Sequence, residues 1–176
     1  MKISVIAIFY NSSAYIKKCI QSILDQQDVF IELIAVDDCS TDDTLKLLQE
    51  YAIIDDRIKI IKHQKNRGIA AARNSGIKAA SGDCFYLIDG DDYLPNNALS
   101  SLAKHFSPEV DWVQGGYEIR NEKNLKIADH IYKYGKYTTH QEIENHFFDI
   151  ELVYTHNKLI NCKLKKWSTF SEGIIH

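Results

Sequence analysis

Three carboxylates follow one apolar segment of this chain. Asp89, Asp91 and Asp92, with Gly90 after the first of them, come directly after the apolar residues 84–88. The end of a buried strand would hold these side chains close together, where like charges repel unless a cation lies between them. Oxygen ligands suit a hard divalent ion, Mg²⁺ or Mn²⁺, which also binds phosphate oxygens. The segment therefore predicts a metal–diphosphate site, although an acidic turn without any ligand uses the same residue types.

Two further aspartates, Asp37 and Asp38, also stand directly after an apolar run. The chain up to residue 107 alternates strand-like runs with segments whose apolar residues recur at helical spacing. The predicted strands are residues 3–8, 31–36, 58–61 and 84–88. Such repeats predict a parallel, right-handed, doubly wound sheet, in which ligands bind beyond the carboxyl ends of the strands. Both acidic groups lie at such ends, so we expect them to share one site.

The second part of the chain has a less regular pattern. Residues 95–106 are a predicted helix and 111–117 a predicted strand, whereas 118–145 receive no assignment. Apolar residues within 143–150 predict a helix face or a cluster. Residues 163–167 combine three lysines with a tryptophan, which fits either a solvated surface or contact with an anionic membrane or a lipid-linked acceptor.

Composition and charge restrict the class of protein. With 176 residues, 45% of them hydrophobic, the chain can bury the core of one domain. A net charge of −3 argues against a general nucleic-acid binder. The four cysteines lack zinc-ligand spacing, and no run approaches the ~20 apolar residues of a membrane span. We therefore expect a cytoplasmic protein with reduced thiols, whose only membrane contact would be peripheral, at the inner face.

Four motifs in order along residues 3–92 resemble the family 2 glycosyltransferases of the GT-A fold. The motifs are Phe9-Tyr10-Asn11, Asp37-Asp38-Cys39-Ser40, Asn66-Arg67-Gly68 with Ala72-Arg73-Asn74-Ser75-Gly76, and Asp89-Gly90-Asp91-Asp92, which is similar to the DXD motif. The resemblance implies a three-layer α/β/α, Rossmann-like fold with a mainly parallel central sheet. It also implies one domain over 1–176, with a nucleotide-sugar-binding half at 1–107 and an incomplete acceptor-binding half at 108–176.

The resemblance further implies a nucleotide site and a metal site. Asp38 would accept a hydrogen bond from the uracil N–H, with Asp37 supporting its turn, and Asp89 would approach the ribose or the sugar. Asp91 would hold Mn²⁺ or Mg²⁺ against the diphosphate of the departing nucleotide. The implied nucleotide-binding residues are Phe9, Tyr10, Asn11, Asp37, Asp38, Gly68, Arg73, Asp89 and Gly90.

Several positions depart from the family's pattern. Cys39 replaces a glycine, which costs about 1 kcal/mol if the backbone there is left-handed. Gly90 stands where relatives often have serine, and this change is expected to matter little. The family's general base follows the segment that ends here at His176, so the catalytic residue stays unassigned, with Glu172 the nearest carboxylate. We expect the chain to be a truncated part of a longer enzyme.

The leading hypothesis is an inverting, metal-dependent glycosyltransferase that moves a sugar from a UDP-sugar to a hydroxyl of a glycan or lipid-linked acceptor, in cell-surface polysaccharide synthesis. The alternative is a nucleotide-sugar-binding fragment or non-catalytic subunit that lacks the general base. A phosphatase or phosphotransferase with a nucleophilic aspartate would place it after the first strand, where this chain has Phe9-Tyr10-Asn11. A dinucleotide oxidoreductase would need a GxGxxG motif at that place. Both classes are disfavoured.

Overall fold

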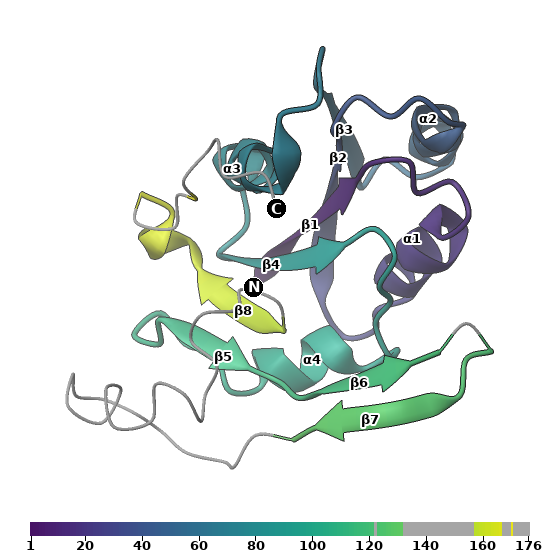
Figure 1. Ribbon diagram of the computed structural model, residues 1–176. Coiled ribbons are helices and arrows are strands. Elements are labelled where there is room, and N and C mark those ends of the chain that lie inside the picture. The colour runs from purple at the N-terminus through teal and green to yellow at the C-terminus, as the bar shows by residue number, and fades with distance from the viewer. Residues whose placement is uncertain (122, 132–156, 167–169, 171–176) are drawn as a thin grey trace.

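A computed structural model of the chain describes residues 1–121, 123–131, 157–166 and 170. Its centre is a six-stranded sheet with the strand order β3-β2-β1-β4-β8-β5 (Figure 1). Four neighbouring strands run parallel: β1 (Lys2–Phe9), β2 (Phe30–Asp37), β3 (Ile58–Lys62) and β4 (Cys84–Asp89). β8 (Lys158–Asn161) lies antiparallel between β4 and β5 (Trp112–Gln114). The predicted, mainly parallel sheet is confirmed.

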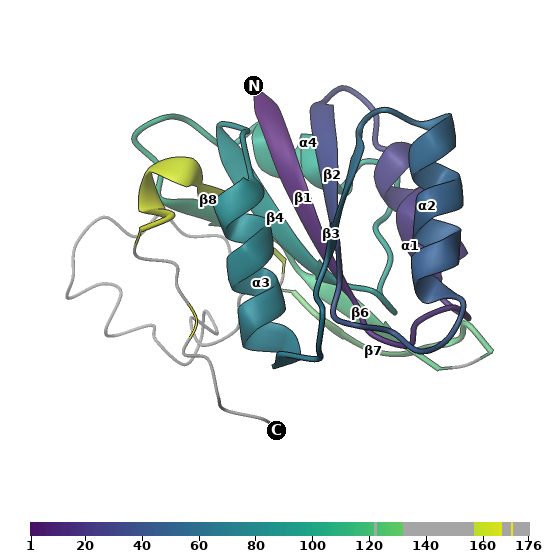
Figure 2. The same cartoon turned by 90° about the horizontal axis from the view of Figure 1, so that it is seen from above.

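Helices cover both faces of this sheet. Side chains of α1 (Ile16–Leu24), α2 (Thr44–Ile54) and α4 (Ala98–Ala103) pack into one apolar core, and those of α3 (Gly68–Ala79) into a second core on the opposite face (Figure 2). Because both faces are covered, the central strands are apolar at nearly every position, as parallel strands usually are. A short 3₁₀ helix, Cys162–Leu164, follows β8. The arrangement is the predicted three-layer α/β/α fold.

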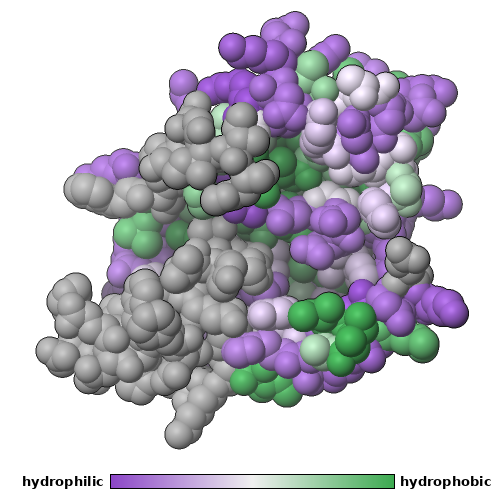
Figure 3. Space-filling model, in the orientation of Figure 1, coloured by the Kyte–Doolittle hydropathy of each residue, from purple (hydrophilic) through white to green (hydrophobic). Residues whose placement is uncertain are grey.

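A separate antiparallel hairpin is formed by β6 (Tyr117–Arg120) and β7 (Lys126–His130). Four large apolar side chains are exposed on and beside it: Ile119, Leu125, Ile127 and Ile131. Figure 3 shows apolar surface over this part of the molecule. The predicted strand over 111–117 is therefore wrong in its extent. The chain leaves the central sheet after Gln114 and enters the hairpin at Tyr117, so the pair of glycines at 115–116 separates two strands of different sheets.

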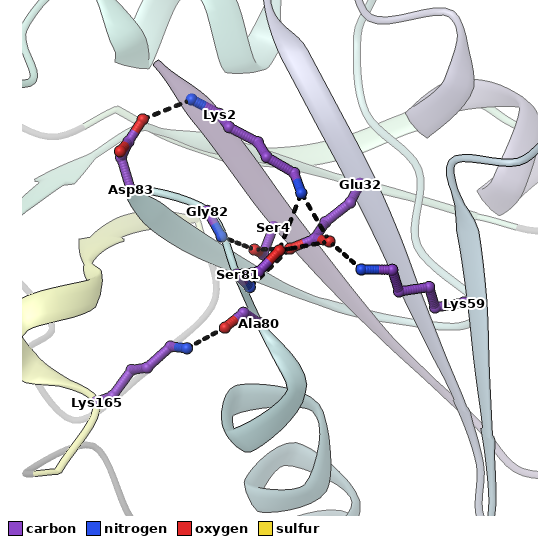
Figure 4. A network of polar contacts seen from close by, with 9 residues as sticks. All are labelled: Lys2, Ser4, Glu32, Lys59, Ala80, Ser81, Gly82, Asp83 and Lys165. Atoms are coloured by element: carbon purple, nitrogen blue, oxygen red, sulfur yellow. Dashed lines mark hydrogen bonds and ion pairs between the residues drawn. The ribbon is translucent and has the colours of Figure 1, made fainter.

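Glu32 is a buried carboxylate at the amino-end edge of the parallel strands. It accepts hydrogen bonds from the hydroxyl of Ser4 at 2.6 Å, the Ser81 N–H at 2.7 Å, and the ammonium groups of Lys59 at 2.8 Å and Lys2 at 3.0 Å (Figure 4). Burial by itself raises the pKa of Glu32, but the hydrogen bonds from Lys59, Ser4, Ser81 and Lys2 outweigh it and hold the pKa well below its usual range. The ionised carboxylate therefore ties β1, β2, β3 and the turn before β4 together.

Candidate functional site

The carboxyl ends of the parallel strands bring the two acidic groups to one edge of the sheet. In the strand register, Phe9 lies beside Asp37 and Ile8 lies beside Asp89. The Asp38 N–H also donates to the Phe9 carbonyl at 2.9 Å. Residues that are far apart in the sequence thus become neighbours at the ends of β1, β2 and β4.

The loop after β1 is tied to the turn after β2 through Asn11. The Asn11 N–H donates to the Ser40 hydroxyl at 3.0 Å, and its side-chain oxygen accepts from the Thr41 N–H at 2.8 Å. Asn11 has a φ of +50°, a left-handed conformation that asparagine tolerates better than most residues. Of its two predecessors, Phe9 is fully buried and Tyr10 is exposed. The Tyr10 side chain is therefore the one that can contact a ligand.

The turn after β2 contains Asp37 and Cys39. The buried Asp37 carboxylate accepts from the Ser40 N–H at 3.3 Å, which closes the turn. Cys39 has a φ of +64°. The condition for its predicted cost of about 1 kcal/mol is met, because a left-handed backbone favours glycine over residues with a Cβ.

Asp38 is buried, and the groups that contact its carboxylate come from the segment between β3 and α3 and from the first residue of α3. Its carboxylate lies 2.6 Å from Nδ1 of His63 and accepts from the N–H groups of Arg67 at 2.9 Å and Gly68 at 2.8 Å. Gly68 begins α3 with a φ of +81°, for which glycine is suited. Asp38 thus holds the amino end of α3 beside β2.

His63 is a residue that the sequence pattern does not single out. It follows β3 directly and is buried, with Nε2 2.8 Å from the hydroxyl of Ser75 on α3. An Nδ1–H donated to Asp38 leaves Nε2 to accept from Ser75, which satisfies all three groups. Its place at the carboxyl end of a strand was the one available signal, since that edge also carries Asp38.

At the end of β4, Asp89 pairs with Arg73 of α3. The Nη2 atom of Arg73 lies 3.0 Å and 3.3 Å from the two carboxylate oxygens. Asp91 and Asp92 follow and are exposed. Although Asp92 keeps exposed surface, desolvation by neighbouring protein atoms raises its pKa to about 6, and the charges of Asp91 and Asp89 add to the rise. The pKa of the nearby Cys19 thiol is raised to about 12, mainly by burial and further by the charges of these same three carboxylates.

The crowded carboxylates at the end of β4 suit a divalent cation. Within the part of the chain that the structure describes, no three His, Cys, Asp or Glu side chains are grouped so that they could hold a metal ion. Mg²⁺ commonly binds one or two carboxylates and completes its shell with water and substrate phosphates. Asp91 and Asp92, both exposed, offer carboxylates of the kind that such a shell uses.

Gly90 lies against the end of β1. A Cβ at this position would be 2.5 Å from Cδ1 of Phe9 and 2.7 Å from the carbonyl oxygen of Ile8. Any side chain here requires both the ring and the backbone to move. The expectation that glycine in place of serine matters little is therefore wrong for this chain.

Lysines of the predicted basic patch contact the protein itself. Nζ of Lys163 lies 3.0 Å from Oδ1 of Asp111, and Nζ of Lys165 contacts the Ala80 carbonyl. No helix in the described ranges is both long and apolar enough to cross a membrane. Trp167, Glu172 and the apolar residues predicted at 143–150 lie outside the described residues.

Known proteins are similar to this chain in sequence and in fold. The sequence model of the family described as Glycosyl transferase family 2 matches residues 4–165. EpsH of Bacillus subtilis (strain 168), provisionally named a glycosyltransferase, is 35% identical over 127 residues, which are 72% of this chain and 37% of EpsH. Chondroitin synthase of Escherichia coli is 37% identical over 101 residues, which are 57% of this chain and 15% of the synthase.

Crystal structures of TarS from S. aureus have a similar fold. TarS 1-349 superimposes with a TM-score of 0.74 and 25% sequence identity, covering 97% of this chain and 50% of that one. TarS 1-349 in complex with UDP-GlcNAc matches 59% of this chain and 30% of its own, with 34% identity and a TM-score of 0.55. The chain therefore spans half or less of each of these relatives.

Proposed function

This chain belongs to glycosyl transferase family 2, and we propose that it binds a UDP-sugar and transfers the sugar, with inversion, to a hydroxyl of a glycan or lipid-linked acceptor. The observation that carries the proposal is the edge of the sheet where the turn after β2 and the acidic end of β4 lie on the two sides of β1. Two relatives support the choice of substrates. One TarS structure contains UDP-GlcNAc, and chondroitin synthase is named for a polysaccharide product.

The two acidic groups would bind opposite ends of the donor. The turn of Asp37 and Asp38, joined to Tyr10 and Asn11 across the edge, would flank the uracil base. Asp89 would accept a hydroxyl of the ribose or the sugar, and its pairing with Arg73 fixes the carboxylate for that contact. Their places at the ends of β2 and β4, with β1 between them, suit an elongated ligand such as a nucleotide-sugar.

Asp91 would hold Mn²⁺ or Mg²⁺, since it is exposed and follows the paired Asp89 by two residues. A bound divalent ion would neutralise charge on the diphosphate as the nucleotide leaves. Burial, and after it the charges of Asp91 and Asp89, raise the pKa of Asp92, and a bound cation would offset both effects.

The acceptor hydroxyl needs a carboxylate within hydrogen-bond reach to take its proton. We assign this role to no described residue. We place the reaction in the cytoplasm, because all four cysteines are free thiols, as is usual in reducing compartments. Contact with a membrane surface would be peripheral.

A thermal-unfolding panel of UDP, GDP, CDP and ADP, each with Mn²⁺, Mg²⁺ or EDTA, tests the donor site. UDP at 100 times its dissociation constant stabilises a native protein by about 2.7 kcal/mol. For a chain of 176 residues, this corresponds to a rise of about 7 °C in the midpoint. Among the four nucleotides, we expect this rise with UDP only, and only when a metal is present, and we expect Asp91→Ala to abolish it.

Asp56→Ala is the matched control, since Asp56 is an exposed aspartate just before β3, at the amino-end edge of the sheet. It should respond to UDP and metal like the wild-type protein. An unchanged midpoint with every nucleotide and metal would refute the donor site. If UDP binds, glycosyl transfer to an added acceptor distinguishes an enzyme from a non-catalytic binding subunit.

A further inference from the structure

Asn74 of α3 joins the helix to Phe170, 96 residues further along the chain. Its side-chain Nδ2–H donates to the Phe170 carbonyl at 2.9 Å, and its Oδ1 accepts from the Phe170 N–H at 2.8 Å. The amide therefore pairs with both backbone groups of one residue, as a neighbouring strand would. Two such bonds fix both the position and the orientation of the Phe170 backbone.

The ring of Phe170 lies over Arg73, the residue before Asn74. The guanidinium carbon of Arg73 is 5.5 Å from the ring centroid, within the range of a cation–π contact. Only 17% of the Arg73 side chain is exposed, and its buried Nε has no hydrogen-bond partner among the described residues. The guanidinium is thus held on one side by an aromatic face, and its surroundings are partly dehydrated.

Arg73 continues this chain of contacts to Asp89, whose two oxygens lie 3.0 Å and 3.3 Å from Nη2. An ion pair that is shielded from water is stronger and better ordered than an exposed one. Asp89 is 39% exposed, so the pair is covered on the side of Arg73 and open on the side of the carboxylate. The contacts therefore run from Asn74 through Phe170 and Arg73 to the acidic end of β4.

We propose that Asn74 and Phe170 are positioning residues, which hold the Arg73 guanidinium beside Asp89 and so order its positive charge for the diphosphate of the donor. The inference rests on the proposed function, because it names how one part of that donor site is ordered. Without the Asn74 bonds, the Phe170 ring loses its fixed place over Arg73. Arg73 then samples other rotamers and must be ordered again when a diphosphate binds.

The test compares UDP with uridine, which has the same base and ribose but no phosphate. Affinities are measured with Mn²⁺ present, by calorimetry for UDP and by NMR titration for uridine. We expect Asn74→Ala to weaken UDP binding about tenfold, which is the size of change expected when one charge-assisted contact is lost. Uridine binding should change less than twofold. Phe170→Leu keeps the backbone bonds but loses the aromatic face, and should weaken UDP binding about threefold. Phe170→Tyr keeps the face and should bind UDP like the wild-type protein.

Asn97→Ala is the matched control, because Asn97 is exposed and its side chain makes no capping bond to α4. Unchanged UDP affinity in Asn74→Ala, or an equal loss of UDP and uridine affinity, would overturn the inference. If Asn74→Ala does not fold, the Phe170→Leu and Phe170→Tyr pair decides alone, and equal UDP affinities in that pair overturn it. A wild-type protein that binds neither ligand refutes the proposed function itself, and this inference with it.

Discussion

Cys39 occupies a left-handed backbone position, with a φ of +64°, in the turn that follows β2. Replacing it by glycine removes the contact between Cβ and the following carbonyl that makes this conformation unfavourable. The informative comparison is Cys39→Gly with Cys39→Ala. Both variants lose the half-buried thiol, so their difference reports the backbone alone.

The expected difference is a small balance of two opposing effects. A left-handed conformation costs a residue with a Cβ about 1–2 kcal/mol. Glycine also stabilises the unfolded state relative to alanine by about 0.4–1 kcal/mol, because the unfolded chain has more conformational freedom at glycine, and this offsets part of the gain. We therefore expect Cys39→Gly to exceed Cys39→Ala in free energy of unfolding by about 0.5–1 kcal/mol. With an unfolding entropy of about 0.4 kcal/mol/K for 176 residues, this is a rise of about 1–3 °C in the midpoint.

Urea unfolding followed by circular dichroism measures this difference at one temperature. Glu50, exposed in the middle of α2, provides the opposite control, since Glu50→Gly should be about 1 kcal/mol less stable than Glu50→Ala in a helix. Equal stabilities at position 39, or a more stable alanine variant, would refute the argument from strain. If the glycine variant is less stable than the alanine variant at both positions, glycine acts only through the greater freedom of the unfolded chain.

Two further predictions concern other parts of the fold. Glu32→Gln should lower the free energy of unfolding at pH 7 by about 1–3 kcal/mol, because it breaks up a buried hydrogen-bond network. Since the folded-state pKa of Glu32 is lowered, its stabilisation is present above the unfolded pKa of about 4.3 and is lost as the pH falls through the folded value. The stabilities of wild type and variant from urea titrations should therefore begin to approach each other as the pH falls below about 4 and continue to do so toward the folded pKa, and a constant difference would contradict this. Gly90→Ser should cost about 1–3 kcal/mol through its overlap with Phe9 and the backbone. Phe9→Val should recover at least about 0.5 kcal/mol of it in a double-mutant cycle, and strictly additive effects would contradict the overlap.

The four parallel strands could be predicted because their burial is recorded in the sequence itself. Strands covered on both faces are apolar at consecutive positions, and each predicted run lies within the observed β1, β2, β3 or β4. The position of β8 in the sheet could not be predicted from its local sequence. Its residues, Lys158–Asn161, pair with both β4 and β5 across more than 40 positions of sequence, and partner choice over that distance depends on packing rather than on local pattern.

The residues of the candidate site were easier to predict than their contacts. Aspartates at strand ends are visible in the sequence, and strand order alone brings Asp37 and Asp89 to the two sides of β1. The contact of Asp89 with Arg73 depends on how far α3 sits from the sheet, which no motif specifies. His63 becomes informative only after the fold places it against Asp38, because a single histidine after a strand has many uses.

The position of α3 determines the geometry of the whole edge. Its first residue binds Asp38 at the end of β2, and three consecutive residues in its middle reach Asp89, Phe170 and His63. The helix can approach this closely because position 76 is glycine, where a Cβ would overlap the side chain of Ile6 on β1. One packing distance between α3 and β1 therefore sets several polar contacts at once. The candidate site, assembled in this way, depends on the core beneath it as much as on the carboxylates at its surface.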